Sequence, residues 1–292
     1  MQNVTPAAMV AFTLELLPAV AFGFAAERVT KVVQRWPMAV RVLAPSLLVL
    51  PYVIVATAQR DFGWDWFALY AAMPVAVAAL LWHASIADPK QRGNWRDAFV
   101  LLVLGLAVDL RWFEAAWPSG LRALNELLLV DIGLYGFLAV RQLSGTGFDF
   151  HLKASDFKTG LRELVFFAPI VLALGWALHF IHPHPKAPAI GAAILRWILI
   201  FLFTAVPEEL FFRGWMQNLL ERRVGRRFGL VIASVLFGLS HFNKRSPSFN
   251  WRYVILATIA GIFYGRAWRE RRRVPASTIT HATVDWLWSW WF

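Results

Sequence analysis

The feature that most constrains this chain is a series of apolar runs, each close to the length needed to cross a lipid bilayer. A helix of roughly 20 residues spans a hydrocarbon core of about 30 Å, and such runs recur along almost all of the 292 residues. Hydrophobic residues make up 59% of the chain and charged residues only 16%. The sequence therefore predicts an all-α fold, a polytopic transmembrane helix bundle of about 10 helices (range 8–10).

Ten candidate spans can be placed along the chain, with boundaries good to a few residues. They cover residues 7–26, 38–58, 67–87, 98–113, 121–140, 163–181, 189–212, 228–242, 251–268 and 275–291. Most of the 29 Lys and Arg fall in the odd-numbered connections between them. Because cytoplasmic loops are rich in these residues, we expect both termini to lie outside the cytoplasm. No basic segment precedes the first apolar stretch, so we expect it to remain as a helix.

Composition also excludes several functional classes. The net charge of +11 is typical of basic cytoplasmic loops, so we expect the lipid bilayer as a partner and no nucleic acid. The chain has no cysteine, which excludes disulfides, thiolate metal sites and a cysteine nucleophile.

A polar segment from Arg141 to Arg162 is the longest interruption of the apolar pattern, and its Ser and Gly residues favour a boundary there. We predict an N-terminal transmembrane helical region of unknown role at 1–150 and a catalytic transmembrane domain at 151–292. In the first region, Glu15, Glu126 and Asp131 are interpreted as structural residues.

Three polar clusters lie within hydrophobic stretches of the second region. They are Glu208, Glu209 and Arg213; then His241, four residues after Phe237; then His281, four residues before Asp285. A charged side chain at the centre of a bilayer costs roughly 2.5 kcal/mol or more, so such groups usually face a polar interior and a partner. The function of the chain is therefore to be sought in these clusters.

Helix geometry divides the first cluster into two roles. Glu209 and Arg213 are four residues apart on one helical face, in the favourable order for an ion pair. Glu208 is rotated from Glu209 by about 100°, so the two carboxylates cannot share the arginine equally. We expect Arg213 to hold Glu209 while Glu208 points into the site, beside the helix bend that Pro207 favours.

A carboxylate and two imidazoles brought together support two kinds of chemistry. They bind a metal ion, or they activate water and stabilise an oxyanion. The residues alone leave both open. The predicted spans also place Glu208 near one membrane face and His241 about 20 Å from the start of its helix at Phe228, so a common site requires a tilt, a deeper start or a re-entrant path.

At these positions the chain resembles a known family. The strings Glu208-Glu209-Leu210-Phe211-Phe212-Arg213, Phe237-Gly238-Leu239-Ser240-His241 and His281-Ala282-Thr283-Val284-Asp285 are similar to the three ordered motifs of the CAAX protease and bacteriocin-processing (CPBP or ABI) family. The resemblance covers roughly residues 155–292. It implies an intramembrane glutamic-type endopeptidase, often described as a metalloprotease, whose eukaryotic relatives remove the last three residues of prenylated proteins.

The resemblance also implies roles for individual residues. Glu208 would activate water with help from His241, Glu209 and Arg213 would order the site, and His281 would stabilise the oxyanion with the help of Asp285. The prenyl-protein enzymes have asparagine where this chain has Asp285, which weakens the expectation of a prenylated substrate more than that of protease activity. No cofactor is favoured. If a divalent metal such as zinc is bound, its ligands would be Glu208, His241 and His281.

The predicted substrate is a membrane-associated protein or peptide, lipidated or carrying a C-terminal sorting segment. The predicted location is a bacterial cytoplasmic (inner) membrane, as a multi-pass protein. Two other classes stay open: a catalytically silent membrane protein that binds a peptide, as in bacteriocin immunity or scaffolding, and a proton-coupled transporter that uses buried Glu and His as a relay. The intact set of Glu208, His241 and His281 favours an enzyme, and the absence of an apparent internal repeat disfavours a transporter.

Overall fold

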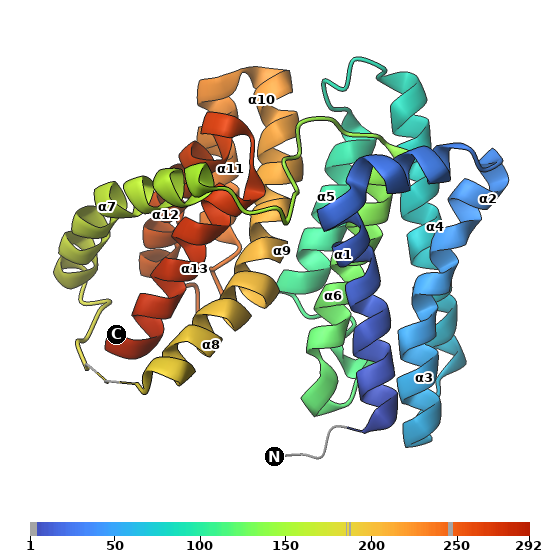
Figure 1. Cartoon of the computed structure of the whole chain (residues 1–292), viewed down its shortest axis with the longest axis horizontal. Coiled ribbons are helices and arrows are strands. Elements are labelled where there is room, and N and C mark those ends of the chain that lie inside the picture. The colour runs from blue at the N-terminus through green and yellow to red at the C-terminus, as the bar shows by residue number, and fades with distance from the viewer. Residues whose placement is uncertain (1–4, 185, 187, 245–247) are drawn as a thin grey trace. The chain divides into compact units, whose positions relative to one another are not determined.

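The computed structural model describes residues 5–184, 186, 188–244 and 248–292, and all regular structure in this part of the chain is helical. The chain divides into two compact units, Met1–Ser144 and Gly145–Phe292. Figure 1 shows the helices of each unit. The prediction of an all-α helix bundle is confirmed.

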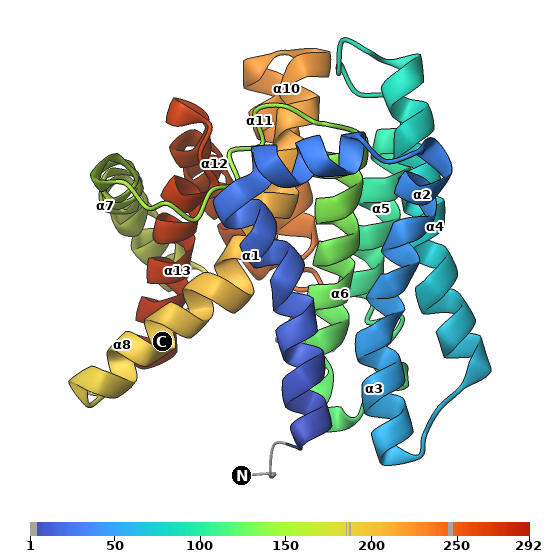
Figure 2. The same cartoon turned by 45° about the vertical axis from the view of Figure 1, so that its right-hand side comes forward.

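The first unit is a bundle in which α1 packs against α3 and α6, as both views show (Figures 1 and 2). Its helices are joined by short 3-10 helical segments at Ala44–Val49, Glu114–Ala116 and Ser119–Leu121. The last helical segment of the unit is π-helical and covers Tyr135–Val140. The helices are α1 (Pro6–Gln34), α2 (Met38–Leu43), α3 (Leu50–Gln59), α4 (Trp64–Ala87), α5 (Trp95–Asp109) and α6 (Ala123–Leu134).

The second unit contains one long helical stretch from Ile190 to Val224, interrupted by the π-helical segments Phe201–Ala205 and Leu210–Gln217. The helices that follow in the chain pack against it, and α7 packs against α12 and α13. The helices are α7 (Ala154–Ala177), α8 (Ile190–Ile200), α9 (Val206–Glu209), α10 (Asn218–Val224), α11 (Arg226–Leu239), α12 (Trp251–Arg271) and α13 (Val274–Trp291).

Helices occur at all ten predicted spans. In the described residues, six stretches are long and apolar enough to cross a membrane: Pro6–Gln34, Met38–Gln59, Trp64–Ala87, Ala123–Val140, Ala154–Ala177 and Ile190–Val224. The chain is therefore an integral, multi-pass membrane protein. Among the others, α5 and α11 have only 15 and 14 residues, and α12 and α13 are interrupted by charged and polar side chains.

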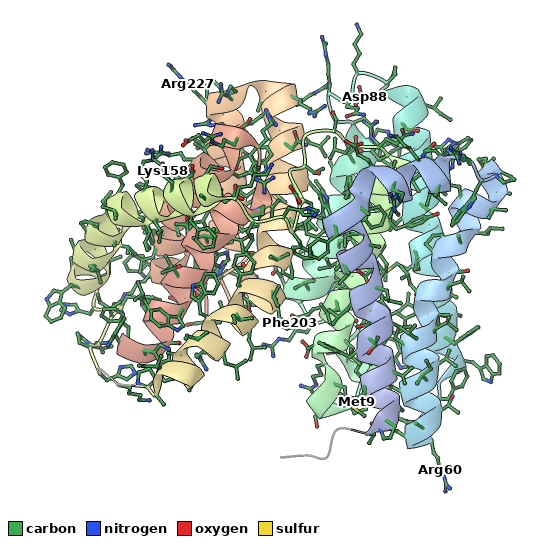
Figure 3. The ribbon with its side chains drawn as sticks, in the orientation of Figure 1. Met9, Arg60, Asp88, Lys158, Phe203 and Arg227 are labelled. Atoms are coloured by element: carbon green, nitrogen blue, oxygen red, sulfur yellow. The ribbon has the colours of Figure 1, made fainter. Side chains whose placement is uncertain are left out.

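Basic residues mark one end of each unit. In the first unit Lys90, Arg92 and Arg96 follow α4, at the end of the bundle marked by Asp88 and opposite to Arg60 (Figure 3). In the second unit the labelled residues Lys158 and Arg227 lie at one common end (Figure 3).

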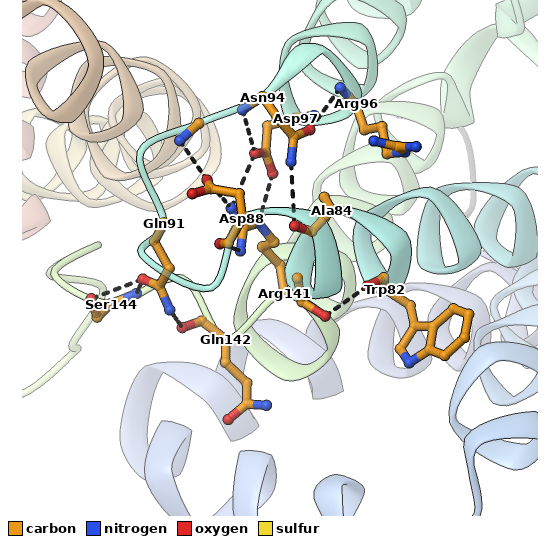
Figure 4. Close-up of polar contacts among 12 residues, drawn as sticks. Trp82, Ala84, Asp88, Gln91, Asn94, Arg96, Asp97, Arg141, Gln142 and Ser144 are labelled. Atoms are coloured by element: carbon orange, nitrogen blue, oxygen red, sulfur yellow. Dashed lines mark hydrogen bonds and ion pairs between the residues drawn. The ribbon is translucent and has the colours of Figure 1, made fainter.

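A buried ion cluster closes the basic end of the first unit. Arg141 follows the π-helical segment and donates to the carboxylates of Asp97 at 2.9 Å and Asp88 at 2.8 Å (Figure 4). Asp97 also caps α5 through a reciprocal capping box with Asn94. Removing one partner of such a buried set would leave an uncompensated charge, so this cluster fixes the α4–α5 connection against the end of the π-helical segment Tyr135–Val140.

The segment after Ser144 is bound along the second unit. Trp268 donates its indole N–H to the carbonyl of Thr146 at 2.9 Å. Arg273 donates to Asp149 and to Asp156, each at 2.7 Å. These bonds join the entry segment and the first turn of α7 to the start of α13, and so set the position of α13 relative to α7.

Close helix contacts bring α11 into the middle of the second unit. A Cβ at Gly238 would overlap the side chain of Thr258, and one at Gly261 would press on the backbone of Ser234. Small residues therefore allow α11 and α12 to pack at short distance. Beside this contact lies an apolar core of Phe167, Phe212, Phe237, Ala257, Ala260, Phe263 and Tyr264.

Candidate active site

The paired glutamates lie where the long helix is least regular. Pro207 has no N–H to donate to the helix, and π-helical segments stand on both sides of the short stretch Val206–Glu209. Such π segments occur frequently at functional sites because they alter the direction of side chains. Here they present Glu208 and Glu209 to different surroundings.

Glu209 is the buried link between two elements. One carboxylate oxygen lies 3.1 Å from Nε of Arg213 and the other lies 2.9 Å from Nδ1 of His281. The side chains of Glu209 and Arg213 are both fully buried. The structure thus pairs Glu209 with Arg213, four residues later, and joins both to α13.

The Arg213 guanidinium is held by aromatic rings as well as by Glu209. Its carbon lies 4.7 Å from the ring centre of Phe237, 5.8 Å from that of Tyr264 and 5.9 Å from that of Phe212. A cation above aromatic faces gains electrostatic stabilisation that increases when water is excluded. Arg213 is therefore a rigid support for Glu209.

His281 is oriented from several directions. While Nδ1 faces Glu209, Nε2 lies 3.4 Å from Oδ2 of Asp285 and 3.9 Å from Oε2 of Glu208. The ring of Tyr264 stacks on the imidazole, with centres 4.7 Å apart and planes inclined by 18°. Nε2 therefore faces both Asp285 and Glu208, the less buried of the two glutamates.

His241 has one defined ring nitrogen. Nδ1 lies 2.8 Å from the carbonyl oxygen of Phe237. A carbonyl only accepts, so Nδ1 carries the hydrogen of this bond and Nε2 of the neutral ring is an acceptor. The ring also packs against Tyr253, with centres 4.8 Å apart. The nitrogen left for a ligand or water is therefore Nε2.

A helical hairpin brings His241 to the depth of Glu208. The chain turns at Gly225, whose φ of 86° and ψ of 162° fall in a region that only glycine adopts readily. Glu208 precedes this turn by about as many residues as His241 follows it, so the antiparallel arms place both at one level. Nζ of Lys244, three residues after His241, accordingly lies 3.8 Å from Oε1 of Glu208.

This hairpin corrects the predicted end of the span at 189–212. The helix continues to Val224, so Glu208 lies in its middle rather than near one membrane face, and the expected mismatch in depth between Glu208 and His241 does not arise. Charged side chains near and beyond the predicted end are paired within the fold, because Arg213 pairs with Glu209 and Glu221 lies 3.1 Å from Arg272.

The structure thus brings all six predicted site residues into one neighbourhood. Glu208, Glu209, Arg213, His281 and Asp285 are linked by ion pairs. His241 joins them through Phe237, whose ring centre lies 4.9 Å from the ring of His241 and 5.8 Å from that of His281.

Two further residues of the site were not predicted. Tyr264 stacks on His281, and Nζ of Lys244 lies 3.8 Å from Oε1 of Glu208. Tyr264 is one of many aromatic residues in apolar stretches, so its residue type did not distinguish it as a candidate site residue. Lys244 follows His241 by three residues, and that spacing could have drawn attention to it.

The donor set does not fit a metal ion held by Glu208, His241 and His281. Both ring nitrogens of His281 already face carboxylates, Nδ1 toward Glu209 and Nε2 toward Asp285. Within the described ranges, no group of three or more His, Asp or Glu side chains is arranged as metal ligands. No step of the chemistry below is therefore assigned to a metal.

Helices that enclose paired glutamates and two histidines within a membrane protein form the kind of site expected of an intramembrane hydrolase. Residues 190–287 match the model of the family described as type II CAAX prenyl endopeptidase Rce1-like. This part of the second unit is therefore a domain of the CAAX protease family, a family of intramembrane endopeptidases that act on membrane-associated proteins. The matched range contains all six predicted site residues. Comparison with curated proteins and with solved structures gave no match.

Proposed function

We propose that the chain is a glutamic-type intramembrane endopeptidase in which Glu208 activates the attacking water. The observation that carries this proposal is the contrast between neighbouring carboxylates. The side chain of Glu209 is fully buried between Arg213 and His281, whereas that of Glu208 keeps 25% of its surface exposed. Glu208 is therefore the glutamate that water and a peptide can approach.

The first step is hydrolytic attack. Water donates one hydrogen to the Glu208 carboxylate and the other to Nε2 of His241, and both contacts orient its lone pair toward the scissile carbonyl. As the new C–O bond forms, Glu208 takes the proton and the carbonyl oxygen becomes an oxyanion. His281 donates from Nε2 to that oxyanion, which is stabilised strongly because the donor is already oriented.

The second step releases the products. The tetrahedral intermediate collapses, the C–N bond breaks, and the proton held by Glu208 passes to the departing amine. Glu209 and Arg213 act on this chemistry by positioning, since they hold His281 and the helix that carries Glu208. Asp285 accepts from Nε2 of His281 until the oxyanion forms.

The proposed substrate is a membrane-associated protein or peptide, lipidated or with a C-terminal sorting segment. The family of the domain supports a substrate that reaches the site from the bilayer. A bacterial cytoplasmic membrane is the proposed location. Metal-free water activation is also part of the proposal, and the engagement of both His281 nitrogens supports it.

The experiment compares cells that carry the native protein with cells that carry Glu208→Gln at matched expression. Whole-membrane proteomics identifies C-terminal and internal cleavage products, and Glu27→Gln, at a side chain that is 93% exposed on α1, serves as the control. We expect fragments that disappear in Glu208→Gln and persist in Glu27→Gln. The lost fragments would identify the substrate as well.

An unchanged fragment profile, with folded protein present in the membrane, would contradict the proposal. The role of a silent peptide-binding or scaffold protein would then apply. Proton flux in vesicles that depends on Glu208 would instead support a transporter.

A further inference from the structure

A buried acidic side chain in the first unit has no role in the proposed protease. Glu15 lies in the membrane-spanning helix α1 with 2% of its surface exposed, and neither carboxylate oxygen has a hydrogen-bond partner among the described residues. Buried polar groups nearly always have partners, and ionisable groups at membrane depth usually mark a proton or ion pathway. The carboxyl group of Glu15 therefore needs a binding partner, such as an ion or a proton, that the described protein atoms do not provide.

A second buried carboxyl group acts on Glu15 from the neighbouring helix. Asp131 of α6 has 1% of its surface exposed, and its Oδ2 also lacks a hydrogen-bond partner in the described part of the chain. Helices α1 and α6 pack side by side (Figure 2), and the charge of Asp131 acts on Glu15. Two carboxylates in one apolar interior repel each other unless a positive charge or a proton is present.

The surrounding elements provide no compensating cation. The main packing partners of α1 are α3, α6 and the segment Tyr135–Val140, and none of them contains Lys or Arg. Their ionisable residues are Tyr52, Glu126, Asp131 and Tyr135. On α1 itself the first cation is Arg28, roughly three and a half turns from Glu15. A structural ion pair therefore does not account for Glu15.

A group of hydrogen-bonded side chains around Tyr70 extends from the neighbourhood of Glu15 to the α5–α6 connection. Tyr70 of α4 is fully buried and interacts electrostatically with Glu15. Its hydroxyl lies 3.0 Å from Oδ1 of Asn125 and 3.1 Å from the carbonyl of Phe113, so it donates to one or the other. It accepts from the indole N–H of Trp117 at 2.8 Å. Phe113 and Trp117 belong to the connection between α5 and α6, where the helices end.

We propose that Glu15 and Asp131 form a proton-binding site in the first unit, and that its proton exchanges through Tyr70 with the α5–α6 connection. A proton fits better than a metal ion because Tyr70, which interacts electrostatically with Glu15, is hydrogen-bonded toward the α5–α6 connection, whereas the described residues offer no set of three or more His, Asp or Glu ligands. The site lies wholly within the first unit, so it stands apart from the proposed protease function.

The experiment is infrared spectroscopy of the full chain in lipid vesicles. A protonated carboxyl group has a carbonyl stretch distinct from carboxylate bands, and this band shifts when its hydrogen is replaced by deuterium. The variants are Glu15→Gln, Asp131→Asn and Tyr70→Phe, with Glu27→Gln as the control because Glu27 is an exposed glutamate of the same helix. Labelling glutamate with carbon-13 in the native protein identifies a Glu15 band even if Glu15→Gln fails to fold.

We expect an acid band that shifts with labelled glutamate, disappears in Glu15→Gln, changes in Asp131→Asn and remains in Glu27→Gln. Tyr70→Phe should keep the band and slow its deuterium shift about tenfold or more. Absence of a labelled acid band at any pH at which the protein is folded would overturn the proposal. So would a band that never exchanges with deuterium, which marks a sealed structural acid, or one that sodium removes at constant pH, which marks a metal-ion site.

Discussion

The two adjacent glutamates of the site have opposite relations to their surroundings. Glu209 is fully buried and bridges Arg213 and His281, while Glu208 is partly exposed beside Lys244. Glu209 therefore mainly stabilises the fold, whereas Glu208 is mainly available for the reaction. Amide substitution separates these roles because it removes the charge and keeps the shape.

We predict that Glu209→Gln lowers the free energy of unfolding by about 3–5 kcal/mol, the usual cost of leaving a buried charge such as that of Arg213 without its partner. Glu208→Gln should leave the thermal unfolding midpoint in detergent nearly unchanged while abolishing cleavage. Both variants are compared by thermal unfolding and by cleavage of a substrate found in the proteomic experiment. Equal loss of stability in both would contradict this division.

The sequence allowed the charged residues of the site to be predicted because each is an ionisable group in an apolar stretch. Tyr264 could not be predicted, since a tyrosine in a chain with 24 Phe and 16 Trp carries no such contrast. The contact of Lys244 with Glu208 depends on the length of two helices. The lengths of these helices depend on charge pairs between distant residues, which the local pattern of apolar residues does not indicate.

At the scale of elements, the turn between α10 and α11 depends on one backbone conformation. We predict that Gly225→Ala lowers the free energy of unfolding by about 1–3 kcal/mol, because a side chain there is strained in the backbone region that glycine alone occupies readily. No atom lies within 4 Å of a Cβ at Gly225, so the whole cost comes from the backbone. Thermal unfolding measures it.

Gly191→Ala is the matched control, because its Cβ also meets open space and it lies in a helix. There, alanine should leave the unfolding midpoint equal or higher, since glycine disfavours helices by up to about 1 kcal/mol. Equal effects of the two substitutions would show that the conformation at Gly225 is not strained for alanine.

The contact between the entry segment and α13 should respond to acid. Burial alone would raise the pKa of Asp149, but hydrogen bonds from Arg273 and His151, together with the Arg273 charge, hold it below its ordinary value of 3.8. A group whose pKa is lower in the folded state stabilises that state fully at higher pH, and this contribution is lost as pH falls through the folded-state pKa. We therefore predict weakening of this contact only below about pH 3.8.

Hydrogen exchange of residues 145–153 measures this weakening. In native protein the protection of this segment should fall as pH drops below the ordinary pKa of aspartate, after correction for the intrinsic exchange rate. In Asp149→Asn the protection should be lower at neutral pH and depend less on acid. An identical acid response in the variant would assign it to another group.

The order of the helices was largely predictable because each has a continuous apolar run. The 35 residues from Ile190 to Val224 were not recognised as one helix, since the predicted span ended at residue 212. Glu221, in the part that was missed, is paired with Arg272 at the end of α12. A pattern confined to neighbouring residues does not contain that long-range contact.

At the scale of the whole molecule, the distribution of basic residues predicts the orientation in the membrane. Exposed residues at predicted opposite faces are Arg60 and Lys90 in the first unit and Lys186 and Arg227 in the second. Since the chain has no cysteine, a single Cys at each position gives an unambiguous label. We expect a membrane-impermeant thiol reagent, added outside intact cells, to label Arg60→Cys and Lys186→Cys.

Lys90→Cys and Arg227→Cys should react only after the membrane is permeabilised, because cytoplasmic loops carry the basic residues. Labelling with the reverse pattern would invert the orientation of the whole chain. A reverse pattern in one unit alone would show that the predicted number of membrane crossings between the labelled positions of the two units is wrong.

The hairpin at Gly225 makes the site depend on chain length. Glu208 and His241 reach the same depth because two helical arms of matched length run from one turn. One extra residue in either arm would turn its active group by about 100° and move it by about 1.5 Å along the axis. A substitution along the arms keeps this register, whereas an insertion on one side shifts it. From Glu208 to His241, the chain therefore tolerates substitutions far better than insertions or deletions.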